Sequence, residues 1–472
     1  MNNKARNFIA NFSYTLISNL ISLIISTLVV MIIPKLIGVE QYGYWQLYLF
    51  YSSYVGFLHL GWIDGIYLRY GGKTYEELDK NKFFSQFHML SFTQFAIAVF
   101  VFFVTFVINM EGDKGFILQM TAICLFVSNL RNMLNFILQG TNRIKEFAQI
   151  TLIDRITYIA LILIFLLAGV KEYKLMIIAD LIGKLISLIY AMYTCKEIVF
   201  RKVSSFYINI KEAITNINVG IKLMFSNIAS MLVIGIVRFG IERYWDVSTF
   251  GKVSLTLSIS NLLMIFINAV GIIMFPLLRR TDKKKLPAFY ILMRTFIMVI
   301  MMGFLLFYHP LRVVLSAWLP QYKDSLMFMA LLFPLSAYEG LTALLINTYL
   351  KTMREEKAMM YINLVTMGLS LAMTGIFAGL LHNLNLTILS ITMLLSVRCI
   401  LAETYLTKKM KISVKKDIIL EVVLVAIFMF SGWFINSWLT SLIYLGVYMV
   451  YLLLKKKDIV SSYKSIRELM KL

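Results

Sequence analysis

Charged side chains inside long apolar stretches are the residues of this sequence whose chemistry is most informative. A charge near the centre of a bilayer costs about 2.5 to 3.5 kcal/mol on insertion scales, so each one needs an oppositely charged partner or a water-filled cavity. Cations in such a cavity bind anionic groups such as a diphosphate, and carboxylates there bind or release cations. The candidates are Asp64, Arg131, Asp154, Arg155, Asp180, Lys184, Lys222, Lys252, Arg294, Glu339, Arg398 and Glu403.

Three of the cations have no oppositely charged neighbour at helical spacing, namely Lys222, Lys252 and Arg131. We predict that they bind an anionic substrate. Lys222 and Lys252 lie near the ends of apolar runs, however, so snorkelling to the membrane surface explains them equally well. Arg69 is a fourth candidate for substrate binding. Arg69 and Arg294 both lie at predicted cytoplasmic helix ends, where anchoring is the simpler interpretation.

The carboxylates divide into paired and unpaired groups. Asp180 and Lys184 are four residues apart on one helix face, which indicates a self-neutralising structural pair. Glu339 and Arg398 lie deep in different apolar runs, and we expect them to pair between helices. Asp64 and Glu339 are the candidates for coupling to an ion, because coupling needs a group whose charge changes or is masked as a cavity reorients.

An aromatic cluster begins where the second apolar run starts. Tyr48 shares a helix face with Tyr44 and Tyr51. These rings either form an interfacial belt or stack on a sugar, and Tyr48 is therefore a candidate substrate-binding residue.

The composition excludes a water-soluble globule. Hydrophobic residues make up 60% of the chain, charged residues 15%, and the mean hydropathy is +0.78. Because a bilayer requires every backbone polar group to be paired within its segment, apolar runs of about 20 residues indicate membrane-spanning helices. Fourteen runs are predicted to span, at residues 8–33, 45–68, 83–108, 116–138, 150–170, 175–194, 219–240, 253–278, 289–307, 326–350, 359–381, 386–406, 418–435 and 438–454. The last two are also consistent with one reentrant hairpin.

Charge in the gaps between runs predicts the orientation. Most of the 46 Lys and Arg residues lie at the two termini and in gaps after even-numbered runs, as expected for cytoplasmic loops. Both termini are thus predicted to be cytoplasmic. The first run is long and lacks a small-residue cleavage site, so we expect it to be retained. We attribute the net charge of +21 to the orientation of the chain in the membrane and to contact with membrane lipids, and not to nucleic-acid binding.

The sequence also contains an internal repeat. A gapless shift of 208 residues aligns Ser18–Ser52 with Ser226–Ser260, and it pairs SNLIS with SNIAS and VEQYG with VSTFG. Run 1 therefore corresponds to run 7 and run 2 to run 8. The predicted fold is an all-α membrane protein with an N-lobe at 1–212, a C-lobe at 213–410, and two further helices with a basic tail at 411–472. Gly43 and Gly251 are expected to form tight turns with positive φ.

The stretch from Pro34 to Gly43, PKLIGVEQYG, followed by Leu60-Gly61 and Arg69-Tyr70, resembles the opening of bacterial polysaccharide flippases. These are the O-antigen and capsule repeat-unit flippases of the multidrug/oligosaccharidyl-lipid/polysaccharide superfamily. The resemblance implies an inner-membrane protein that turns a polyprenyl-diphosphate-linked oligosaccharide from the cytoplasmic to the outer leaflet, for surface polysaccharide synthesis. It also implies a cationic cavity lined by helices 1, 2, 7 and 8. Asp64 departs from the apolar or small residues that the resemblance leads us to expect late in helix 2.

Other functions stay open at this point. An ion-coupled drug exporter or a lipid II flippase of the same superfamily would share the architecture. A membrane polymerase or ligase is disfavoured because the predicted outer gaps are short. The scattered histidines and the absence of a phosphate-binding loop indicate that the chain is not an enzyme, and we expect no cofactor and no metal. H+ or Na+ is the expected coupling ion, and other polysaccharide-assembly proteins are candidate partners.

Overall fold

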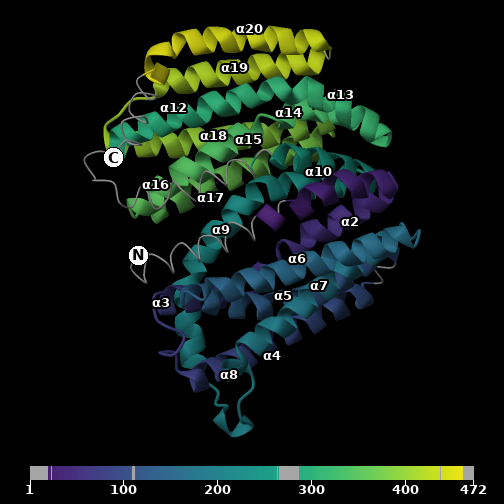
Figure 1. The fold of residues 1–472 in the computed structure, drawn as a ribbon, viewed down its shortest axis with the longest axis vertical. Coiled ribbons are helices and arrows are strands. Elements are labelled where there is room, and N and C mark those ends of the chain that lie inside the picture. The colour runs from purple at the N-terminus through teal and green to yellow at the C-terminus, as the bar shows by residue number, and fades with distance from the viewer. Residues whose placement is uncertain are drawn as a thin grey trace. The chain divides into compact units, whose positions relative to one another are not determined.

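The computed structural model describes residues 20–22, 24–108, 112–262, 264, 286–435 and 437–460, and every regular element in these ranges is a helix (Figure 1). Ten helical segments within them are long and apolar enough to cross a membrane. The predicted all-α, multi-pass fold is confirmed. Runs 8–33 and 253–278 and the basic gap from Arg279 to Lys285 lie partly or wholly outside the described residues. Contacts divide the chain into two compact units, Met1–Ile228 and Ala229–Leu472.

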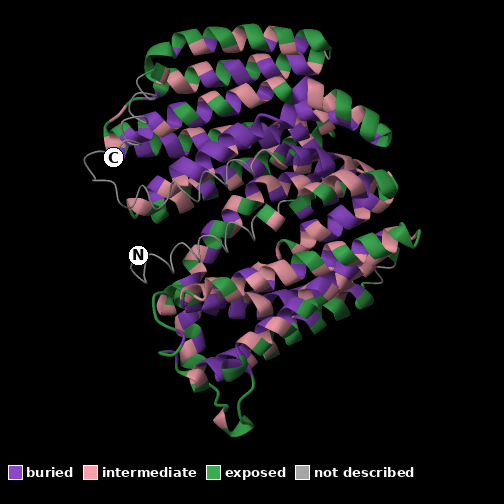
Figure 2. Ribbon diagram, viewed as in Figure 1, coloured by how far each residue is buried: buried purple, intermediate pink, exposed green. Residues whose placement is uncertain are grey.

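Unit 1 is built around α5, the helix whose apolar span is the most buried of this unit. It packs against α2, α3, α4 and α7. By contrast α4 and α6 are largely exposed, as Figure 2 shows, and α4 presents Phe92, Phe103 and Phe106 outward as a bilayer-facing helix must. The elements are a helix over 24–36, α2 (Val39–Ser52), η1 (Val55–His59), α3 (Trp62–Tyr70), α4 (Lys80–Val107), α5 (Gly112–Gly140), α6 (Ile144–Leu167), α7 (Tyr173–Thr194), α8 (Lys196–Val199), η2 (Val203–Ser205) and the first part of α9 (Ile210–Tyr244).

Unit 2 also has a buried central span, over Ser325–Thr352, but here it is divided into short segments. The two C-terminal helices α19 and α20 are separate and pack against each other. After α9 the elements are α10 (Val247–Leu262), α12 (Leu286–Phe304), η4 (Leu305–Phe307), α13 (Tyr308–Trp318), η5 (Pro320–Tyr322), η6 (Ser325–Phe328), α14 (Met329–Leu332), α15 (Leu335–Leu341), η7 (Thr342–Ile346), α16 (Asn347–Thr352), α17 (Glu356–Thr374), η8 (Gly375–Leu380), α18 (Leu384–Met410), α19 (Lys415–Phe434) and α20 (Trp438–Leu454).

The internal repeat is visible in the backbone. A helix ends at Leu36 and the next begins at Val39, and 208 residues later α9 ends at Tyr244 and α10 begins at Val247. Corresponding hydrogen bonds close both turns, from the N–H of residue 37 to the carbonyl of 33 and from that of 245 to 241. The same local sequence therefore folds the same way in both units.

Two predictions about the first repeat are wrong. Gly43 and Gly251 lie inside α2 and α10, and neither has positive φ. The turn before α2 uses Gly38 at φ −62°, an extended conformation that needs no left-handed residue. Run 45–68 is also not one helix, because Leu60 (φ 54°) and Gly61 (φ 81°) are left-handed and break it between η1 and α3.

Glycines bring α3 into backbone contact with the first part of α9. A Cβ added to Gly65 would lie 1.8 Å from the carbonyl oxygen of Asn216, and one added to Gly220 would lie 2.0 Å from that of Gly61. Gly61 and Gly65 have the Gly-x-x-x-Gly spacing that lets membrane helices approach closely. Only glycine fits at these positions.

We predict that Gly65→Ala destabilises unit 1 by about 1 to 3 kcal/mol, because the two backbones must separate to admit a methyl group. Thermal unfolding in detergent micelles measures the effect. Gly56→Ala is the matched control, since a Cβ there meets nothing within 4 Å. Equal midpoints for the two variants would contradict the prediction.

Candidate substrate and coupling sites

Arg131 lies in a three-helix polar contact inside unit 1. Its guanidinium on α5 donates to the Asp154 carboxylate on α6 at 2.6 Å and to the Ser187 hydroxyl on α7 at 2.9 Å. The sequence shows no oppositely charged residue within a helical turn of Arg131, and the structure supplies one, Asp154, from a neighbouring helix. The pair neutralises the Arg131 charge.

Tyr48 belongs to a second buried contact of unit 1. It is fully buried and donates its hydroxyl to Asp180 at 2.7 Å. Lys184 pairs with the same carboxylate, so the predicted Asp180–Lys184 pair is confirmed. The Tyr48 ring is therefore enclosed, whereas Tyr44 and Tyr51 of the same helix are half-buried.

Arg69 connects α3 to α9 within unit 1. It donates to Glu212 at 2.8 Å, and the Tyr70 hydroxyl donates to the same carboxylate at 2.6 Å. Asn216 also accepts from Arg69. Arg69 is thus held by protein groups and stabilises the glycine crossing described above.

Lys222 and Lys252 are the two predicted substrate cations that form no ion pair with any residue in the described ranges. Lys222 is exposed on α9, and Lys252 is half-buried on α10. Asp246, in the turn before α10, accepts from Thr249, which is the main reason that its pKa lies below the ordinary value. Lys252 makes a smaller contribution in the same direction.

The two predicted coupling carboxylates have different surroundings. Asp64 is buried near the start of α3, and its Oδ2 lies 3.7 Å from Nε2 of His59. Glu339 on α15 pairs with Arg398 on α18, which confirms the predicted interhelical pair. Arg398 also donates to Ser230 of α9 at 3.1 Å.

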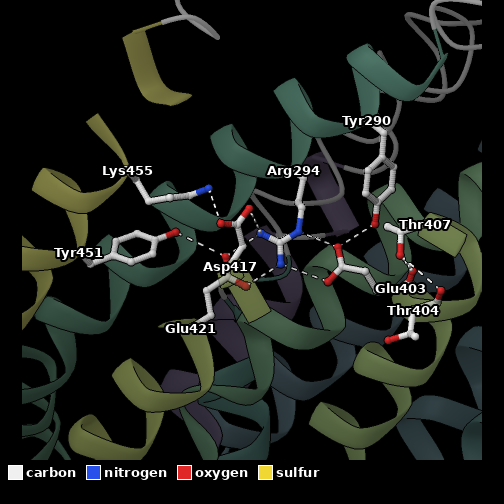
Figure 3. A network of polar contacts seen from close by, with 9 residues as sticks. All are labelled: Tyr290, Arg294, Glu403, Thr404, Thr407, Asp417, Glu421, Tyr451 and Lys455. Carbon is white, nitrogen blue, oxygen red and sulfur yellow. Dashed lines mark hydrogen bonds and ion pairs between the residues drawn. The ribbon is translucent and has the colours of Figure 1, made fainter. Parts of the chain in front are cut away.

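Arg294 is the centre of the charged cluster drawn in Figure 3, and the prediction that it anchors to the cytoplasmic surface is wrong. Its side chain is 1% exposed and lies between Glu403 of α18 and Glu421 of α19. The closest contacts are 2.6 Å from Nε to Glu403 and 2.8 Å from each terminal nitrogen to Glu421. A fourth hydrogen bond joins Nη2 to Glu403 at 3.1 Å, so the buried guanidinium is not available to anchor at the membrane surface.

Further side chains complete this cluster and tie α20 to it. Tyr290 donates to Glu403 at 2.8 Å, and Lys455 pairs with Asp417 at 2.8 Å. Sequence reasoning missed Glu421, Asp417 and Lys455. A carboxylate near the start of the apolar run 418–435 was the available signal for Glu421.

Comparison with known proteins places this geometry in a fold family. No family model and no curated protein matches the sequence. Solved structures do match. The lipid II flippase MurJ, in an inward closed conformation, aligns with a TM-score of 0.65 at 16% identity, over 96% of this chain and 100% of that chain. An inward-facing multidrug resistance MATE transporter of the MOP superfamily aligns at 0.61 and 13% identity, over 84% and 99%.

An outward-facing MATE transporter also aligns, at 0.53 and 15% identity, over 87% of this chain and 96% of that chain. The chain has the fold of the MOP-superfamily transporters. Among the described residues, Lys222 and Lys252 form no ion pair, and the ionisable group next to Asp64 is His59.

We predict that Arg294→Met costs about 3 to 5 kcal/mol, because it leaves two buried glutamates without a cation. The triple variant Arg294→Met/Glu403→Gln/Glu421→Gln should recover most of the loss. Thermal unfolding in micelles measures both. Arg155→Met is the control, since Arg155 is exposed on α6. A triple variant no more stable than the single one would show that charge pairing is not what Arg294 provides.

Proposed function

We propose that the protein is a flippase that moves a polyprenyl-diphosphate-linked oligosaccharide from the cytoplasmic to the outer leaflet by alternating access. The location would be a bacterial inner membrane, with both termini cytoplasmic and the product used for surface polysaccharide. The observation that carries the proposal is the extent of the fold match. MurJ aligns over 96% of this chain, whereas the MATE structures leave more of it unmatched, at 84% and 87%. A lipid-linked cargo is therefore favoured over a small drug.

The charge distribution supports an anionic cargo. Arg131, Lys184, Arg294 and Arg398 are each neutralised by a carboxylate within their own unit. Lys222 and Lys252 lack such a partner among the described residues and are free to bind a diphosphate. They lie on α9 and α10, the repeat equivalents of the first two predicted helices.

The second candidate is a lipid II flippase, which the match with MurJ favours directly. Both candidates use a lipid-linked substrate, so the same cationic residues serve either. The drug-exporter alternative follows from the MATE matches. A membrane polymerase or ligase has no support from the fold comparison.

We predict that purified protein in liposomes catalyses leaflet exchange of a fluorescent polyprenyl-diphosphate oligosaccharide, and that Lys222→Ala and Lys252→Ala each slow it by about tenfold or more. A hydrogen bond to a charged group contributes about 1.5 to 3 kcal/mol, which corresponds to this factor. Arg155→Ala, an exposed cation on α6, should leave the rate unchanged.

Three outcomes separate the candidates. Exchange of lipid II but not of the oligosaccharide would select the lipid II flippase. Exchange that persists in both lysine variants would keep the flippase and assign those lysines to snorkelling. Drug transport without exchange of either lipid would select the exporter.

Coupling is proposed to use Asp64 with H+ or Na+, because Glu339 is already neutralised by Arg398. We predict that an imposed proton or sodium gradient accelerates exchange by the natural protein and has no effect on Asp64→Asn, while the rate without a gradient is retained. Glu339→Gln should instead lower thermal stability, since it leaves Arg398 unpaired. A gradient response that survives in Asp64→Asn would remove Asp64 from coupling.

A further inference from the structure

A groove of about 590 Å³ lies between α17 and α18 of unit 2. Its walls include Tyr361 and Val365 of α17 and Leu401 of α18, and its polar end is formed by Glu355, Lys357 and Tyr405. None of these residues is used by the proposed transport mechanism. The groove is therefore a separate feature of the molecule.

The walls of the groove are apolar and open to the surroundings. Tyr361 is 62% exposed, Val365 55% and Leu401 39%. Two predicted membrane-spanning helices supply these side chains, so the surrounding medium along most of the groove is lipid. An acyl chain is the group that fills such a groove without leaving polar atoms unpaired.

The polar end of the groove is held in place by protein contacts. Glu355 accepts from the Tyr405 hydroxyl at 2.6 Å and pairs with Lys409. These contacts fix the turn before α17, where Arg354 has a left-handed backbone with φ 58°, against the end of α18. The Lys409 ion pair, with the Tyr405 hydrogen bond, holds the pKa of Glu355 below its ordinary value. Its carboxylate therefore stays ionised at neutral pH and remains bonded to Lys409 and Tyr405.

Because Glu355 is paired with Lys409, it does not neutralise the other cations at the rim, which is the polar end of the groove. Arg354, Lys357 and Lys408 are exposed and form no ion pair with a described residue. Lys408 follows Tyr405 by three residues, which places it on the same side of α18. Within residues 351–357 and 404–411, Glu356 is the one further carboxylate, so the rim carries net positive charge. The charge pattern assigns this end to the cytoplasm, where anionic lipids create a negative surface potential.

We propose that this groove binds an anionic glycerophospholipid of the cytoplasmic leaflet, with one acyl chain along Tyr361, Val365 and Leu401 and its phosphate at Lys357, Lys408 and Arg354. The site differs from the proposed transport path in both residues and occupant. It would select its lipid by charge, whereas the rest of the apolar surface accepts any acyl chain.

Native mass spectrometry of the full-length protein tests the proposal, using equal amounts of phosphatidylglycerol and phosphatidylcholine with identical chains. The natural protein should retain phosphatidylglycerol preferentially. Lys357→Gln/Lys408→Gln should reduce that preference by about tenfold or more, since each basic residue near an anionic lipid contributes roughly fivefold. Val365→Trp, which fills the groove, should reduce retention of phosphatidylglycerol with the lysines intact.

Lys196→Gln/Lys202→Gln is the matched control, because both lysines are exposed in another predicted cytoplasmic gap. Unchanged thermal midpoints establish that each variant is folded. Equal retention of the two lipids by the natural protein would overturn the proposal, and so would an equal effect of the control pair. Displacement of phosphatidylglycerol by a polyprenyl phosphate at equal concentration would also overturn it, since the groove would then belong to the transport path.

Discussion

The guanidinium of Arg294 lies between two glutamates from different helices. This arrangement illustrates the requirement that a buried charge be neutralised by a partner of opposite sign. Inside an apolar bundle an ion keeps its charge only if a partner of opposite sign and several hydrogen bonds replace its water. Replacing such a cluster with apolar residues would often cost nothing, but removing one member is costly. The cluster thus fixes which helices pack together. It joins α12 and α18 to α19 and α20.

The same constraint acts on the internal repeat. Both units keep the turn that precedes Val39 and Val247, down to its backbone hydrogen bonds, because that turn is specified by local sequence. Arg131 in unit 1 and Glu339 in unit 2 each pair with a residue of opposite charge on a neighbouring helix, Asp154 and Arg398 respectively. Local sequence thus fixes the shared turn, whereas pairing between helices neutralises these two charges within each unit.

Features that depend on local sequence could be predicted, whereas ion pairs between distant helices could not. The helical runs and the Asp180–Lys184 pair depend on spacing within one segment, and the repeat depends on a direct comparison of two segments. All three were predictable from the sequence. The pairs of Arg131 and Arg294 join residues 23 and 127 positions apart, and composition gives no signal for them. The break at Leu60 was missed because leucine rarely adopts positive φ. Its neighbour Gly61 and the Gly61-x-x-x-Gly65 spacing were the visible signals, which an apolar pattern alone obscures.

Lys222 and Lys252, which form no ion pair with a described residue, differ from these neutralised charges. A lysine retained in a membrane segment without a carboxylate needs water or an anionic ligand, and only the ligand is lost and regained in each transport cycle. On the proposed function, an anionic cargo would neutralise each lysine that it contacts while it is bound. A ligand shifts a conformational equilibrium only through its different affinity for the two states. Reorientation would therefore be easiest with the lysines neutralised and hardest with them empty, so that charge pairing with the cargo itself would select the loaded protein for movement.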